Sequence, residues 1–420
     1  MSSIIVTSVR ISLRSIKKVE FLNKLFVFTE NYLKGGGNRY LIDLVNAFAQ
    51  NFDRVTINCN RGGVFPEDLK RLNHDFALIN IPFCTKERAR NALLSLPRWL
   101  RRAILAPLVI FSPIVFVYNL LLFLTLLATA RPAVVLCCNG GYPAAKAPLV
   151  MVLAAKLLDI PVLLSIVSVP MPRSRLLSLY EKVMDYVVWH AVDLIIVNAK
   201  AIAQALLTQR DVLLDKVCVI YNGLENREIP CKSDQVEKIR IGCVARLDRA
   251  KGIIYLLDAF AQLAERYEHL QLVLVGDGDA FQELRSRVKQ YGLNDRVEMP
   301  GFYQGSVDEL LCSLDIYMFP SLWEGFPYSI IEAMRAGCSI IATSVGGIPE
   351  AIRDGEDGLL IEPASSAAIF CAIEKLIEDP ELRARLAVSA RKRFTELFSL
   401  TAMEINALQV LAKTGIATRY

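Results

Sequence analysis

Short apolar runs recur along the first half of the chain, and segments with helical periodicity separate most of them. Each run is four to seven residues long, which is typical of a buried strand. A helix is predicted after the first run, with its apolar side formed by Leu41, Leu44, Val45 and Phe48. The runs span residues 24–29, 54–59, 77–82, 133–138, 161–167, 193–197 and 217–220. Strands that alternate with helices favour a parallel sheet covered on both faces.

A second alternating set follows a polar segment, residues 224–238, that breaks the apolar rhythm. Its apolar runs span residues 239–245, 271–275, 296–299, 315–319, 339–343 and 358–361. Residues 365–397 are predicted to be helical apart from a break at Asp379-Pro380, and residues 399–414 form a last amphipathic pattern.

The length of 420 residues exceeds what one hydrophobic core usually supports. We therefore predict an α/β protein with two doubly wound, Rossmann-like domains that face each other across a cleft. The predicted divisions are residues 1–223, a linker at 224–238, a second domain at 239–398 and a C-terminal helix within 399–420.

Residues 103–130 carry no charge over 28 positions, which is long enough to span a bilayer. The preceding residues 86–102 contain six basic side chains and one acidic side chain. A single crossing would place strands of one sheet on opposite sides of the membrane. We therefore expect a segment that lies in one leaflet, or dips in and returns, with the basic stretch on anionic headgroups. The alternative is a buried apolar helix pair that covers the sheet.

The bulk composition excludes several classes of function. A net charge of +5 and the absence of interleaved basic and aromatic residues do not predict a nucleic-acid surface. Three histidines and no metal-ligand spacing of cysteines predict no metal site. The ten cysteines lack paired spacing, and half of them lie in apolar runs, which favours reduced thiols in a cytosolic protein. Those in apolar runs are Cys59, Cys137, Cys138, Cys218 and Cys243.

Charged residues with possible chemistry follow the predicted strands of the second domain. Arg246 comes just after a strand and Lys251 follows five residues later, and two cations suit the oxygens of a diphosphate. Glu324 lies in a loop and Glu332 in the next helix, so we expect different tasks for them. A loop carboxylate suits a sugar hydroxyl, and a helical one suits the vicinal hydroxyls of a ribose. Taken singly, each residue fits an ordinary surface ion pair or helix cap equally well.

Glycine turns mark the same predicted edge. Gly276 and Gly278 are expected to form a strand-to-helix turn without direct ligand contact. Backbone groups of Phe302 and Tyr303 are candidates for hydrogen bonds to a base, although Tyr303 fits a packing role equally. The turn at 35–37 lies at the equivalent edge of the first domain. Because the carboxyl ends of parallel strands share one edge, these residues are predicted to line a nucleotide-sugar pocket.

Taken together, the order and spacing of these motifs resemble the retaining glycosyltransferases of family 4, which have the GT-B fold. The resemblance covers roughly residues 24–414 and is densest in the second half. It rests on Gly35-Gly36-Gly37, VIYNG (219–223), ARLDRAKG (245–252), VGDG (275–278), GF (301–302), PSLWEGFPYSIIEAMRAG (320–337), VGGIPEAI (345–352) and DGEDGLLIEP (354–363).

The resemblance implies a role for each matching residue. Arg246 and Lys251 would bind the donor diphosphate, Glu332 the ribose and Glu324 the donor sugar at its transferring face. Further contacts to sugar and phosphate are implied for Gly35, Gly36, Gly325, Phe326 and Tyr328. No metal or other cofactor is implied, since the nucleotide-sugar is itself a substrate, and the final helix would return to the first domain.

One departure concerns the histidine that many relatives carry after the fifth strand of the first domain. Residues 165–175 contain none, so Ser165, Ser168 or a backbone group would substitute, or the donor sugar differs. No histidine is therefore assigned a catalytic role.

The predicted function is retaining transfer of a sugar from a nucleotide-sugar to a glycan or a polyprenyl- or lipid-linked acceptor, in polysaccharide or envelope glycan synthesis. The predicted location is the cytoplasmic face of a membrane, reached through residues 86–130. The alternatives are a nucleotide-sugar epimerase, which the scarcity of histidine disfavours, and a non-catalytic nucleotide-sugar-binding scaffold. A dinucleotide oxidoreductase is disfavoured because Gly35–Gly37 lacks the GxGxxG spacing.

Overall fold

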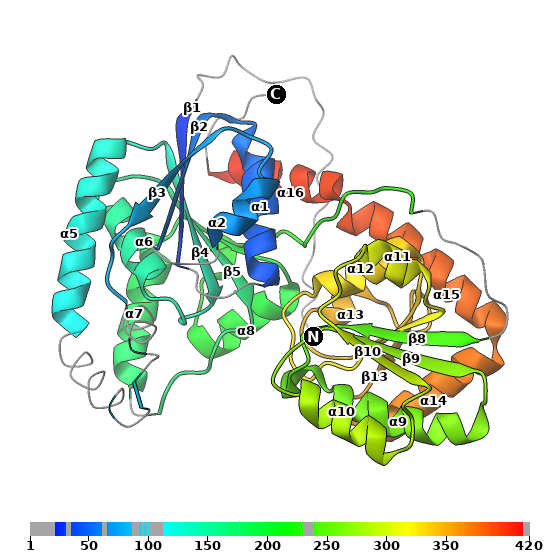
Figure 1. Ribbon diagram of the computed structural model, residues 1–420. Helices are drawn as coiled ribbons and strands as arrows, with labels where there is room; N and C mark the ends of the chain where they lie inside the picture. Colours follow the sequence, from blue (N-terminus) through cyan, green and yellow to red (C-terminus); the bar gives the residue numbers. More distant parts are fainter. Residues whose placement is uncertain are drawn as a thin grey trace, which may run out of the picture.

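Two parallel β-sheets form the framework of the computed structural model (Figure 1). The structure describes residues 22–30, 35–60, 65–85, 93, 96–97, 100, 112–175, 177–229 and 238–414. The first sheet has the strand order β3-β2-β1-β4-β5-β6-β7, and the second has the order β10-β9-β8-β11-β12-β13. Both orders reverse direction near the first strand of the sheet, as in a doubly wound fold. The predicted fold of two Rossmann-like halves is confirmed.

The strands of the first sheet coincide with the apolar runs of the first half of the chain. Their bounds are β1 Leu22–Thr29, β2 Phe52–Asn60, β3 Phe76–Ile81, β4 Val134–Gly141, β5 Val162–Ser168, β6 Leu194–Val197 and β7 Val217–Val219. Most of the central strands read as continuous apolar runs because a parallel sheet is covered by helices on both faces.

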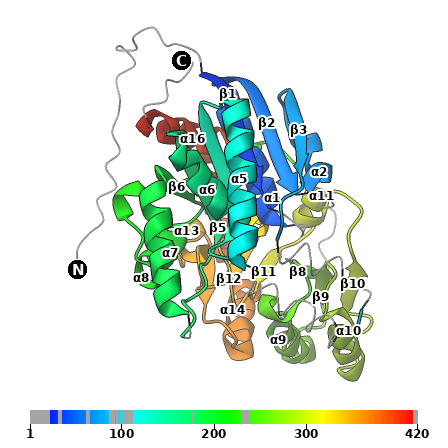
Figure 2. The same cartoon turned by 90° about the vertical axis from the view of Figure 1, so that its left-hand side faces the viewer.

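Helices cover the two faces of the first sheet. Figures 1 and 2 show α5, α6 and α7 on one side, with α1 and the final helix α16 on the other. Helix α16 packs against α1, so this last described helix returns to the first half. The bounds are α1 Gly36–Ala49, α2 Phe65–Asp68, η1 Leu69–Arg71, α5 Ser112–Ala130, α6 Ala147–Leu157, α7 Ser178–Ala191, α8 Lys200–Arg210, η2 Leu214–Lys216 and α16 Leu400–Lys413.

The second half repeats the alternation. Its strands are β8 Ile239–Val244, β9 Leu270–Val275, β10 Val297–Gly301, β11 Ile316–Phe319, β12 Ser339–Thr343 and β13 Leu359–Ile361. Its helices are η3 Arg249–Lys251, α9 Ile253–Arg266, α10 Phe281–Gln290, α11 Val307–Cys312, α12 Tyr328–Ala336, α13 Ile348–Ala351, α14 Ser366–Glu378, α15 Pro380–Arg393 and the π-helical turn η4 Phe394–Phe398.

The predicted helix break at Asp379-Pro380 is confirmed and has a local cause. The Asp379 carboxylate accepts a hydrogen bond from the Leu382 backbone N–H at 2.8 Å, and Pro380 stands at the first helical position of α15. An Asp at the N-cap satisfies a free backbone N–H of the first turn, and a Pro at the first helical position has a φ angle that suits a helix.

Helix α5 is the described part of the charge-free segment 103–130, and most of the basic stretch 86–102 lies outside the described residues. The inner side of α5 packs Phe123 against Phe28 and Phe83 with edge-to-face geometry. Its outer side is exposed: only 17% of the window Pro113–Ala130 is buried. By length and composition the helix could cross a membrane. Residues 103–111, the other part of the expected helix pair, lie outside the described residues.

The cysteines of the apolar strands are buried free thiols, as expected from the sequence. The expectation of reduced thiols is wrong for Cys312, at the end of helix α11, because this residue takes part in a disulfide bond.

Candidate functional site

The loop that carries Glu324 follows β11 and rests on the glycine turn that follows β12. Gly346 has a φ of +54°, and a Cβ there would lie 2.0 Å from the Glu324 carbonyl oxygen. The Gly347 backbone N–H donates a hydrogen bond of 2.7 Å to the Gly325 carbonyl. Only glycine permits this backbone approach. Neighbouring strands β11 and β12 thereby place the two predicted motifs together at one sheet edge.

Lys251 and Glu324 form an ion pair at this edge. Gly252, with φ of +63°, brings the turn η3 against Pro320, since its Cβ would lie 2.1 Å from the Pro320 carbonyl oxygen. The Ser321 hydroxyl donates a 3.0 Å hydrogen bond to the same Glu324 oxygen that Lys251 contacts. The Lys251 and Glu324 side chains are only 19% and 11% exposed. Two residues expected to act on different parts of the donor are therefore direct partners here.

Arg246 lies just after β8, as predicted, but its side chain is 65% exposed and does not join this pair. Its Nε lies 2.5 Å from an Asp248 carboxylate oxygen. Its role toward a diphosphate stays a prediction. The neighbouring glycine turn has the structural role expected of it: Gly276 has a φ of +137°, and a Cβ there would lie 1.8 Å from the Ala245 carbonyl oxygen.

Glu332 faces the other half of the molecule from α12. One of its carboxylate oxygens lies 2.5 Å from Nη1 of Arg39 on α1, and the two side chains are mostly buried. The Arg39 guanidinium also lies over the Tyr328 ring, 4.4 Å from its centroid. The carboxylate expected to hold a ribose is thus engaged with a cation from the opposite domain.

A second contact lies one turn along the same two helices. The Tyr328 hydroxyl donates a 2.7 Å hydrogen bond to the Asp43 carboxylate. Burial raises the pKa of Asp43 to about 6, against the lowering effects of the Tyr328 hydrogen bond and the Arg39 charge. Each helix contributes residues at positions i and i+4, so one face of α1 meets one face of α12. We call Arg39, Asp43, Tyr328 and Glu332 the cross-domain cluster.

Arg39 and Asp43 were missed by the sequence reasoning. The available signal was their spacing of four on the helix that follows the glycine turn 35–37. That spacing defines a shared face, but nothing in the sequence says that the face meets Glu332, which is 293 residues away.

The remaining predicted residues lie around this contact or at its margin. A Cβ on Gly36 would touch the Tyr328 ring at 3.4 Å, whereas Gly35 has no neighbour within 4 Å. Phe326 is buried, and its carbonyl accepts a 2.7 Å hydrogen bond from the Asn222 amide. Phe302 and Tyr303 follow β10, an edge strand of the second sheet.

Of these last two residues, Phe302 is largely exposed and Tyr303 is partly buried against the core. Tyr303 therefore packs against the core, which fits the packing role considered for it. A base contact by Phe302 or Tyr303 stays a prediction.

Glu350 explains two further motifs of the resemblance. Its carboxylate accepts 2.7 Å hydrogen bonds from the backbone N–H groups of Lys200 and Ala201, at the start of α8 in the first half. The Tyr221 hydroxyl donates to the same carboxylate at 2.9 Å. A carboxylate at a helix N-terminus is favoured by the unpaired N–H groups and the helix dipole. The motifs VIYNG and VGGIPEAI therefore hold the two halves together.

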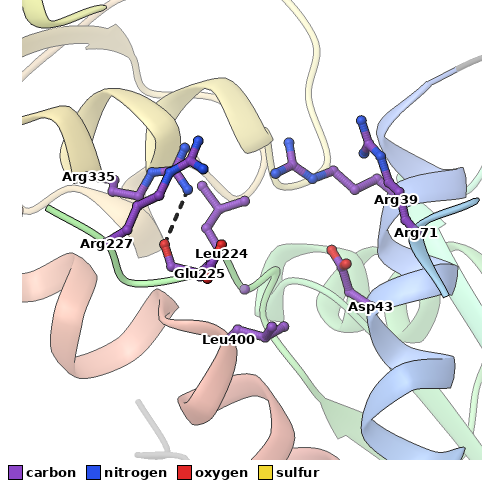
Figure 3. A pocket seen from close by; sticks show the side chains of 9 residues that line it. Arg39, Asp43, Arg71, Leu224, Glu225, Arg227, Arg335 and Leu400 are labelled. Atoms are coloured by element: carbon purple, nitrogen blue, oxygen red, sulfur yellow. Dashed lines mark hydrogen bonds between the residues drawn. The ribbon is translucent and has the colours of Figure 1, made fainter. Parts of the chain in front are cut away.

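A hollow of about 220 Å³ lies behind the cross-domain cluster, next to Gly223–Glu225 (Figure 3). Arg39, Asp43 and Arg71 line it from the first half, and Arg227 and Arg335 face them from the other side. Arg227 and Arg335 both pair with Asp308. Lys251, Glu324 and Arg246 do not line this hollow, so it is distinct from the predicted donor pocket.

Within the part of the chain that the structure describes, no cluster of three or more His, Cys, Asp or Glu is placed to hold a metal ion. The charged groups at the candidate site are instead the Lys251–Glu324 pair, Arg246 and the cross-domain cluster.

Comparison with protein families now adds to this geometry. Residues 34–227 match the model described as Glycosyltransferase Family 4, and residues 226–393 match the model for group 1 glycosyl transferases. The chain belongs to glycosyltransferase family 4. The two matches meet at residues 226–227, after the last strand of the first sheet, and together they contain Gly35, Lys251, Glu324 and Glu332.

Curated relatives match over part of their length. An uncharacterized glycosyltransferase of Methanocaldococcus jannaschii is 32% identical over 44% of this chain and 51% of its own. The alpha-D-kanosaminyltransferase of Streptomyces kanamyceticus is 33% identical over 38% of this chain and 42% of its own. The matching region thus spans about half the length of these curated relatives.

Solved structures resemble the whole fold. A glycosyltransferase from Rickettsia africae superposes with a TM-score of 0.74 at 18% identity, over 94% of this chain and 98% of that one. Anabaena HepE in complex with UDP superposes with a TM-score of 0.72 at 20% identity, over 93% of this chain and 100% of that one. At such identities the likeness establishes the GT-B fold alone.

Proposed function

We propose that this family 4 member is a retaining glycosyltransferase that takes a sugar from a nucleoside diphosphate donor without a metal ion. The observation that carries the proposal is the meeting of Lys251, Glu324 and the α12 N-terminus at one sheet edge, opposite α1. These groups supply a cation, a sugar-binding carboxylate and free backbone donors in one place. Family membership supports the same reaction class.

The diphosphate would bind between Lys251 and the first turn of α12. No side chain caps that turn, because Pro327 occupies the cap position. Its N–H groups and the helix dipole favour an anion. When the donor binds, the Lys251 ammonium would exchange part of its contact with Glu324 for a phosphate oxygen. The freed carboxylate oxygen would then accept a hydrogen bond from a hydroxyl of the donor sugar.

In the transfer step, the bond between the anomeric carbon and the diphosphate oxygen breaks as the acceptor oxygen attacks the same face. The anomeric carbon gains oxocarbenium character, as in glycoside cleavage. The electron pair of the broken bond goes to the diphosphate, where Lys251, Arg246 and the α12 N–H groups stabilise the added charge. The acceptor proton passes to the departing phosphate.

The ribose would bind at Glu332 on the same helix. Its vicinal hydroxyls would replace the Arg39 guanidinium as donors to this carboxylate. Donor binding would then loosen one contact between the halves while the diphosphate contacts form.

The proposed acceptor is a glycan or a lipid-linked glycan, with the enzyme on the cytoplasmic face of a membrane in envelope or polysaccharide synthesis. The exposed, charge-free α5 supports a membrane location. A relative from Campylobacter jejuni, 27% identical over 56% of this chain, is named as a transferase acting on a diphospho-undecaprenol glycan. The basic residues at 86–102 would add attraction to anionic headgroups.

The proposal is tested by screening UDP-, GDP- and ADP-sugars for thermal stabilisation, followed by product analysis by NMR. The expected result is stabilisation by one donor class and a product with the anomeric configuration of the donor. Inverted configuration would contradict the retaining mechanism. Conversion of the sugar in the absence of any acceptor would indicate an epimerase. Tight donor binding with no transfer to any membrane-extracted or soluble acceptor would indicate a scaffold.

A further inference from the structure

The outward side of α7 is apolar. Leu179, Tyr180, Val183, Tyr186 and Val187 are all exposed, with Leu179 at 78% and Tyr186 at 63%. A surface helix of a globular protein usually turns its charged and polar side chains outward. A contiguous apolar surface of this kind marks a contact with another apolar phase or molecule.

The inward side of the same helix is fixed by polar contacts. The buried Asp185 carboxylate accepts a 2.7 Å hydrogen bond from the Tyr142 hydroxyl and pairs with Arg173 at 2.8 Å. Glu181 pairs at 2.8 Å with Arg210, a side chain that is 1% exposed. Both carboxylates of α7 therefore point toward the protein, and these contacts set the rotation that leaves the apolar side outward. Val188 and Trp189 are buried on this inner side as well, so α7 is apolar both inward and outward.

Helix α5 presents a second apolar surface on the same side of the first sheet. Helix α6 packs between α5 and α7, and Figure 2 shows both flanking helices turned to the same side. The α5 residues exposed there include Ile114, Val117, Tyr118 and Leu121. We call these residues, with the five exposed residues of α7, the α5–α7 face.

We propose that the α5–α7 face is a lipid-binding surface, and that α7 contributes to it directly by lying on an anionic bilayer. The proposal rests on the proposed function and extends the membrane contact beyond residues 86–130. Exposed Lys182 lies on α7 and exposed Arg175 lies three residues before the helix begins, while the acidic side chains of α7 are engaged inward. Basic residues beside exposed tyrosines are the composition of a helix at a membrane interface.

The position of this face also relates it to the donor site. Strand β5 ends at Val167 and Ser168, and a Cβ on Gly325 would lie 2.8 Å from the Val167 carbonyl oxygen. The chain then leads through residues 169–177 to the start of α7. A bilayer on the α5–α7 face would therefore lie near the first-domain wall of the cleft, where a lipid-linked acceptor has to arrive.

The test is flotation of the full-length protein with vesicles of phosphatidylcholine alone and with 30% phosphatidylglycerol, chosen as a probe composition of roughly native anionic charge. The variant is Leu179→Glu/Val183→Glu. The control is Ile405→Glu, an apolar residue on α16 that is about as exposed as Val183 (53% against 54%), on the opposite face of the same sheet. Circular dichroism and thermal unfolding monitor folding, and donor-induced stabilisation monitors the donor site independently.

The proposal expects wild-type protein to bind the anionic vesicles, the α7 variant to bind at least about 10-fold more weakly, and the control to bind like wild type. Donor-induced stabilisation is expected to be equal in all three. Equal vesicle binding by the α7 variant and wild type would overturn the proposal while leaving the proposed function intact. The proposal would also be overturned if the wild-type protein does not bind vesicles and is a dimer, while the α7 variant is a monomer. If no nucleotide-sugar stabilises the wild-type protein against thermal unfolding, the proposed function is refuted instead.

Discussion

Asp43→Asn tests whether ionisation of the buried Asp43 carboxyl lowers the free energy of unfolding of the nucleotide-free protein. Burial raises the pKa of Asp43 from its ordinary 3.8 to about 6. A carboxyl with a raised pKa binds more protons folded than unfolded, so stability falls as pH rises between 3.8 and 6. The full difference corresponds to about 3 kcal/mol. Between pH 5.0 and 7.5, the two-state linkage relation predicts that the free energy of unfolding falls by about 1.4 kcal/mol through this group.

Asn keeps an oxygen that accepts the Tyr328 hydroxyl and removes the titrating charge. The free energy of unfolding is measured with urea at pH 5.0 and 7.5 for wild type, Asp43→Asn and the exposed control Asp295→Asn. Wild type and control are expected to lose about 1.4 kcal/mol more than Asp43→Asn between the two pH values. Equal pH dependence in all three proteins would refute the inference that Asp43 is ionised at a cost.

Three further predictions concern single contacts. Gly276→Ala should lower the free energy of unfolding in urea by about 3 kcal/mol or more, because the new Cβ would meet the Ala245 carbonyl. The control Gly292→Ala has open space around the new Cβ and should cost about 1–2 kcal/mol. Equal costs for the two variants would contradict the packing argument. Glu332→Gln should raise the donor KM about 10- to 100-fold through weaker ribose hydrogen bonds, with kcat changed far less; a fall confined to kcat would oppose the ribose assignment. Arg39→Ala should increase the radius of gyration of the nucleotide-free protein in small-angle scattering, and an unchanged radius would mean that the Glu332 contact does not hold the halves together.

The strands were predictable from sequence because each is a short apolar run closed by polar or glycine residues. Runs such as 339–343 are buried from end to end, so no competing surface pattern obscured them. The convergence of Glu324 with Gly346-Gly347 was predictable as well, since parallel strands end at one edge.

The contacts between halves were not predictable, because the sequence gives no relative orientation of two separate sheets. The pairing of Arg39 with Glu332 depends on that orientation. The rotation of α7 was equally hidden: helical periodicity identifies an apolar side, but only the pairing of Asp185 with Arg173 reveals that this side faces outward. Arg246 followed its predicted strand, yet its side-chain direction depends on Asp248, a local partner that the motif does not specify.

The central claim is that cationic groups of the second half receive the donor diphosphate, and calorimetric titration with UDP, GDP and ADP tests it most directly. The proteins compared are wild type, Lys251→Ala and Arg249→Ala, because Arg249 belongs to the same turn but is 89% exposed. One nucleotide is expected to bind wild type and Arg249→Ala equally, and Lys251→Ala at least about 10-fold more weakly, a loss of about 1.4 kcal/mol. Equal affinity of all three proteins for every nucleotide would contradict the account.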